Sequence, residues 1–102
     1  DTRLVILEGI KKISDPKKVV KWLGKKDDIF EPTENALTLL PSLPLSLDEK
    51  RIFRFVDGRR TFLMLLEVSP IDSGKTAKIL YALYVLGLIK KKESGIKIKA
   101  GL

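Results

Sequence analysis

The chain has 102 residues, 44% of them hydrophobic and 32% charged, and it contains neither cysteine nor histidine. This length suits one compact domain with a single core. The two missing residue types exclude disulfides, thiolate nucleophiles, imidazole acid–base catalysis and the usual zinc ligands. Carboxylates, lysines and hydroxyls remain, but most constellations that use them also need a cofactor or a larger scaffold. We therefore expect a non-enzymatic single domain, residues 1–102, with no cofactor and no metal.

The sequence predicts no contact with a membrane. Its longest apolar stretch, residues 79–89, is about half of the roughly 20 residues that a spanning helix requires, so we expect a core helix there. No basic segment followed by an apolar run opens the chain, so no secretory signal is expected. Without a disulfide framework the chain suits a reducing cytoplasm. Because it starts at Asp1, we expect it to be a fragment of a longer protein.

The net charge of +7 is concentrated at the two ends of the chain. Residues 1–26 carry eight basic and three acidic side chains (+5), residues 27–58 carry three and seven (−4), and residues 59–102 carry nine and three (+6). A basic surface indicates nucleic acid or another polyanion as a partner. It is equally typical of lysine-rich helix faces that keep a protein in solution.

Two helices are expected in residues 1–24, ahead of a connector in residues 25–46. Apolar side chains recur at helical spacing in the first of them: Leu4, Leu7, Ile10 and Ile13. A second helix over residues 17–23 follows Asp15 and Pro16, which suit a cap and a first-turn position.

The connector has no helical period, and three prolines interrupt it: Pro32, Pro41 and Pro44. We expect short extended pieces around residues 29–30 and 37–40. The connector also holds four acidic side chains: Asp27, Asp28, Glu31 and Glu34. Their spacing does not match a calcium loop, so a solvated loop is the favoured interpretation.

Three helices are predicted in residues 47–102. The first follows Ser46, which is placed to form a capping box with Glu49. The second follows Thr61 and covers residues 62–68. The third has its start marked by Asp72 and Ser73, runs over residues 75–86, and ends at Gly87.

A hairpin is predicted after the third helix, with strands at residues 88–92 and 96–99 on either side of Ser94 and Gly95. Helix, short helix, longer helix and basic hairpin is the order of a winged helix. The expected fold class is therefore mainly α (α+β): helices followed by a winged-helix-like three-helix unit with a C-terminal β-hairpin wing.

Two strings resemble the PATAN family: Val56-Asp57-Gly58-Arg59-Arg60-Thr61 and Tyr81-Ala82-Leu83-Tyr84-Val85-Leu86-Gly87-Leu88-Ile89. In that family an aspartate–glycine turn opens a short helix, and a leucine-rich helix ends in a Leu-x-x-Gly-Leu-like closure. Residues 7–13 look like the family's middle helix. The resemblance covers most of this chain but only the later part of a PATAN domain. It implies a module of bacterial response regulators or related signalling proteins, acting through protein contacts without established catalytic residues.

The third helix raises the main functional question. Its closure, Leu86-Gly87-Leu88, is also common in unrelated winged helices, so DNA-binding families stay open. Gly74-Lys75-Thr76 fits a nucleotide-binding P-loop poorly, because Ser69 stands where the first glycine belongs and Pro70 offers no N–H.

If Ile79, Leu80, Leu83 and Leu86 face the core, the opposite stripe is Lys75, Lys78, Ala82 and Val85. Lysines neutralise phosphates but discriminate bases poorly. The candidate DNA contacts are the lysines of this helix and of the wing: Lys75, Lys78, Lys90, Lys91, Lys92, Lys97 and Lys99. The wing lysines are equally suited to guarding an exposed sheet edge.

The second half of the third helix is apolar nearly all round, which indicates that both of its sides are covered. The covering elements could be residues 3–23, sequence preceding Asp1, a partner protein or another copy of this chain. The candidate protein interface is Tyr81, Tyr84 and Val85, because tyrosine combines apolar area with a polar tip. Packing of both tyrosines in the core is an equal alternative. Trp22 is expected to fasten its helix to the core, with a binding hot spot as the minority interpretation.

The leading hypothesis is a protein-interaction module in bacterial signalling that binds another protein or another domain of the same chain. The alternative is a DNA-binding winged helix. The two hypotheses predict different surfaces. DNA binding requires an open third helix with the lysines on one face, whereas protein binding predicts a covered helix or an apolar patch.

Overall fold

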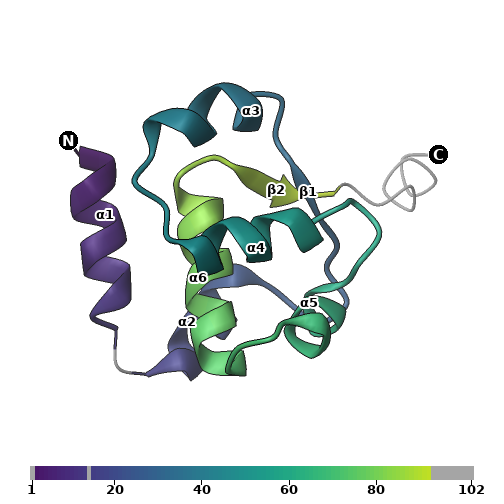
Figure 1. Cartoon of the computed structure of the whole chain (residues 1–102). Coiled ribbons are helices and arrows are strands. Elements are labelled where there is room, and N and C mark those ends of the chain that lie inside the picture. The colour runs from purple at the N-terminus through teal and green to yellow at the C-terminus, as the bar shows by residue number, and fades with distance from the viewer. Residues whose placement is uncertain (1, 14, 93–102) are drawn as a thin grey trace, which may run out of the picture.

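The computed structural model describes residues 2–13 and 15–92, which form a layer of helices around one central helix (Figure 1). In chain order the elements are α1 (Thr2–Lys11), α2 (Pro16–Leu23), β1 (Phe30–Pro32), α3 (Ala36–Leu39), the 3₁₀ helix η1 (Leu40–Ser42), α4 (Leu47–Phe55), α5 (Phe62–Val68), α6 (Ser73–Val85) and β2 (Ile89–Lys91). The predicted mainly helical α+β class is confirmed. None of the helices described has the length and apolarity needed to cross a lipid bilayer.

The helix starts follow the local signals in the sequence. Asp15 caps α2 by accepting the N–H of Lys17, and Ser46 and Glu49 form the predicted capping box of α4. Thr61 and Asp72 cap α5 and α6 in the same way. Each cap satisfies an N–H group that has no partner inside its helix, so these starts depend only on neighbouring residues.

The prediction of an extended piece over residues 37–40 is wrong. Residues 36–39 form α3, and η1 continues directly from it with Pro41 in its first turn. A proline in the first turn of a helix costs little, because its missing N–H would have no partner there. Pro41 is therefore compatible with a helical turn here, and its presence alone does not predict an extended segment.

A small antiparallel sheet joins β1 and β2, which lie far apart in the sequence. Glu31 pairs with Lys90 in its register, and an isolated bridge links Ile29 to Thr61 at the start of α5. The strand predicted at residues 88–92 is therefore confirmed, and its described partner is β1. The second strand of the predicted wing, residues 96–99, lies outside the described residues.

Helix α6 is the centre of the fold. It packs most extensively against α2 and also contacts α1, α4, α5 and β2. Leu80 and Leu83 are fully buried, together with Phe30 and Phe62 from the elements around them. The prediction that both sides of the second half of this helix are covered holds for residues 79–83 but is wrong for Tyr84 and Val85, which are exposed. Helices α1 and α2 supply much of the cover.

Candidate functional site

The candidate interface residues lie on the last turns of α6, where the neighbouring elements no longer cover the whole helix. Tyr84 and Val85 are 37% and 42% exposed, and Tyr81 is half-buried. The ring of Tyr84 meets the buried ring of Phe30 edge-on, with 6.3 Å between the ring centroids. Both tyrosines thus pack against the fold on one side and reach its surface on the other.

Trp22 adjoins this surface from α2. Its ring centroid lies 5.8 Å from that of Tyr81, at an interplanar angle of 41°, yet 53% of the residue is exposed. The prediction that Trp22 fastens α2 to the core is therefore wrong: Val19 and Leu23, both fully buried, hold this helix. We call Trp22, Tyr81, Tyr84 and Val85 the aromatic patch.

The position of Trp22 at the surface has a signal in the sequence. Lys18 and Lys21 lie within one turn of Trp22, and on a short helix that pattern places the ring at the border between the polar and buried faces. Five lysines occupy α2 and the residues after it, all of them exposed: Lys17, Lys18, Lys21, Lys25 and Lys26. Lys18, one helical turn before Trp22, is therefore a basic neighbour of the aromatic patch.

The candidate DNA contacts within the described residues lie near the two ends of α6. Lys75 lies in the first turn of α6, whereas β2 follows the other end of that helix, about 15 Å away along the axis. Lys91 Nζ lies 3.7 Å from Asp28 Oδ2, and Lys92 Nζ donates a 3.1 Å hydrogen bond to the carbonyl of Gly58. Lys97 and Lys99 lie outside the described residues.

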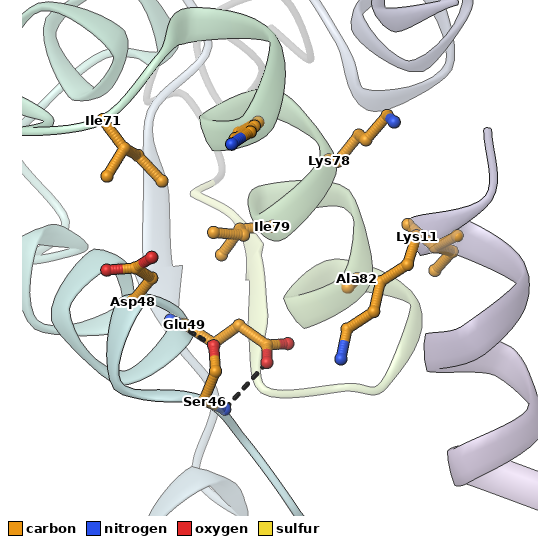
Figure 2. A pocket seen from close by; sticks show the side chains of 10 residues that line it. Lys11, Ser46, Asp48, Glu49, Ile71, Lys78, Ile79 and Ala82 are labelled. Carbon is orange, nitrogen blue, oxygen red and sulfur yellow. Dashed lines mark hydrogen bonds between the residues drawn. The ribbon is translucent and has the colours of Figure 1, made fainter. Parts of the chain in front are cut away.

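The early lysines of α6 border a groove of about 250 Å³ between α1 and α4 (Figure 2). Lys11, Lys75 and Lys78 lie on its α1 and α6 sides, and Asp48 and Glu49 lie on its α4 side. Its apolar lining comes from Ile10, Ile71, Ile79 and Ala82. Of the stripe of α6 that a DNA-reading helix would expose, Ala82 is only 4% exposed and Lys78 is half-buried, whereas Lys75 and Val85 are exposed.

The buried polar groups beside this groove have structural partners. The carboxylate of Glu49, a residue only 3% exposed, accepts the backbone N–H of Ser46 at 2.8 Å. The hydroxyl of Thr76 donates to the carbonyl of Asp72 and contacts the hydroxyl of Ser69. In a P-loop the hydroxyl at this position holds a metal ion, so the burial of Thr76 argues against that alternative.

The acidic connector is also tied into the fold. Asp28 Oδ2 accepts the N–H of Lys25 at 2.7 Å and pairs with Lys91. Within residues 2–13 and 15–92, no three acidic side chains come together as a metal site.

Comparison with protein-family models, characterised proteins and solved structures gave no match. The PATAN resemblance therefore stays a prediction from the strings that carry it.

Proposed function

We propose that this chain is a non-catalytic protein-interaction module whose contact surface is the aromatic patch. The observation that carries the proposal is the exposure of Trp22 on α2 and of Tyr84 and Val85 on α6, joined through the contact of Trp22 with Tyr81, while residues 76–83 of α6 are buried or half-buried. Tryptophan and tyrosine are enriched among the residues that contribute most to protein–protein binding. A half-exposed Trp22 resting on Tyr81 is held in place before a partner arrives, which reduces the entropy lost on binding.

The PATAN resemblance adds a biological setting to this proposal. It implies a module of bacterial signalling proteins, where the partner is another protein, another domain of the same chain or a second copy of this one. The winged-helix-like succession from α4 to β2 agrees with such a module. It does not by itself require DNA, because fold does not determine function.

Site-specific photocrosslinking in cells tests the proposal. A photoreactive phenylalanine analogue at Val85 is expected to crosslink to a defined protein, and the adduct is expected to be lost when Trp22→Ala is added. The same analogue at Lys50, an exposed residue of α4, is the control and should not give that adduct. An adduct of twice the chain mass would identify a second copy as the partner. Absence of any Trp22-dependent protein adduct would overturn the proposal.

A further inference from the structure

The lysines of α2 lie beside the aromatic patch in a way that helix stability does not explain. Lys17 and Lys18 occupy the first turn of α2, which has no acidic side chain, and Lys21 lies in the last turn. The positive end of the helix dipole makes cations unfavourable in a first turn and favourable in a last turn. Lys21 therefore stabilises α2, whereas Lys17 and Lys18 oppose it.

The carboxylates near these lysines have other partners. Asp15 caps α2 through the N–H of Lys17, and Asp28 pairs with Lys91 of β2. The two ion pairs found among the described residues are Lys91–Asp28 and Arg60–Asp57, and neither involves a lysine of α2. Among the described residues, Lys18 and Lys21 thus form no ion pair with a carboxylate.

Position on the helix links these charges to the patch. Lys18 lies four residues before Trp22 and therefore one turn away on the same stripe of α2, and Lys21 lies beside it. Val19 and Leu23 are fully buried and belong to the core. Lys18 and Lys21 are both exposed, so their long side chains are within reach of a partner that covers the exposed side of Trp22.

We propose that the partner presents an acidic amphipathic segment, whose apolar side chains cover the aromatic patch and whose carboxylates pair with Lys18 and Lys21. This inference rests on the proposed function and names the chemistry of its partner. Opposite charge around an apolar centre is the usual arrangement of a specific protein contact. Val85 favours a protein over single-stranded nucleic acid, because a valine extends the apolar area but gives no surface on which a base can stack.

Trp22 is the only tryptophan of the chain, so its fluorescence reports directly on the patch. The chain is titrated with three synthetic helical peptides of roughly 15 residues, long enough to form helices. They share one leucine stripe and carry glutamate, glutamine or lysine on the flanking positions. We expect the glutamate peptide to bind most tightly and to shift Trp22 emission to shorter wavelength, with affinity falling as salt screens the charges.

Charge reversal supplies the matched variants. The double variant Lys18→Glu with Lys21→Glu is expected to raise the Kd of the glutamate peptide about tenfold, because two favourable exposed charge pairs become repulsive. Lys50→Glu with Arg51→Glu, on exposed positions of α4, makes the same change in net charge and should leave binding unchanged. Circular dichroism and thermal unfolding of both double variants verify that they remain folded.

The inference is overturned if the glutamate and glutamine peptides bind with equal affinity. It is also overturned if the charge reversal at Lys18 and Lys21 leaves the affinity for the glutamate peptide unchanged. It is also overturned if a thymidine oligonucleotide of roughly 15 nucleotides, followed by its quenching of Trp22 fluorescence, binds more tightly than any of the peptides. The patch would then act as a base-stacking surface. A Trp22-dependent crosslink from Val85 to a protein of no acidic character would sink this inference and leave the proposed function standing. Loss of the crosslink itself would remove both.

Discussion

The hydroxyl oxygens of Ser69 and Thr76 lie 2.6 Å apart where α5 ends and α6 begins. Ser69 is the C-cap of α5, and Thr76 is fully buried in the first turns of α6, with its hydroxyl also bonded to the carbonyl of Asp72. This short link fixes the turn between the two helices. It makes a polar contact inside a core that is otherwise almost entirely apolar.

Replacing Thr76 with valine keeps the shape of the side chain and removes its hydroxyl. We expect Thr76→Val to lower the free energy of unfolding by about 1–3 kcal/mol, because Ser69 and the Asp72 carbonyl lose a buried partner. Urea unfolding measures the change. Thr38→Val on an exposed position of α3 is the matched control, expected within about 0.5 kcal/mol of the original chain. Equal stability of the two variants would contradict the role assigned to this hydroxyl.

Ser46→Ala should destabilise the protein by about 0.5–2 kcal/mol, since its hydroxyl accepts the N–H of Glu49 in the capping box. Ser73→Ala makes the same chemical change at the exposed first residue of α6, where Asp72 supplies the cap. We expect that variant to unfold almost as the original chain does. Thermal melts of the two variants compare them directly, and the prediction fails if Ser73→Ala loses as much stability as Ser46→Ala.

Gly24 and Gly9 should respond to alanine in opposite directions. Gly24 has φ +153°, and a Cβ there would lie 2.5 Å from Asp28 Oδ2 and 2.9 Å from Lys91 Cε. We expect Gly24→Ala to cost about 1–3 kcal/mol, because it strains the backbone and disturbs the Asp28–Lys91 pair. At Gly9 a Cβ meets nothing within 4 Å. Since alanine favours helices by about 1 kcal/mol over glycine, Gly9→Ala should be neutral or stabilising. Chemical denaturation measures the change in the free energy of unfolding of both variants.

Asp57 makes the turn after α4 sensitive to acid. Its carboxylate accepts the backbone N–H groups of Arg59 and Arg60, and these bonds, with the Arg60 guanidinium, hold the pKa of Asp57 below its usual 3.8. A carboxyl whose pKa is lower in the folded state stabilises the fold above its unfolded pKa, and this contribution disappears as pH falls through the folded value.

The original chain should therefore lose more stability than Asp57→Asn when the pH is lowered from neutral to below 3.8. Unfolding midpoints in urea at the two pH values give the comparison. Glu67→Gln, at an exposed position of α5, serves as the control and should follow the original chain. Parallel acid losses in Asp57→Asn and the original chain would refute the prediction.

Duplex DNA separates the proposed function from its alternative. Because Lys75 and Lys78 border a groove, with Lys91 and Lys92 engaged elsewhere, we expect no micromolar binding of mixed-sequence duplex near physiological salt. Fluorescence anisotropy of labelled DNA measures this. Micromolar binding that weakens steeply with salt and is lost in Lys75→Ala with Lys78→Ala would favour the DNA-binding hypothesis instead.

The sequence by itself determined the helix starts and the apolar character of α6. Asp15, Ser46, Thr61 and Asp72 cap helices through bonds to residues two or three positions away, so the necessary atoms are present in the local string. The apolar run in α6 similarly indicates a largely buried helix without naming what covers it, although Tyr84 and Val85 at its end are exposed.

Only the tertiary structure decided which surfaces are left open. The pairing of β1 with β2, the half-exposed position of Trp22 against Tyr81, and the groove beside Lys78 each join segments far apart in the chain. Local periodicity cannot specify such contacts, because burial depends on which elements pack together. For that reason the sequence offered Tyr81, Tyr84 and Val85 as an interface, while the contact that joins Trp22 to this surface came only from the packing of α2 on α6.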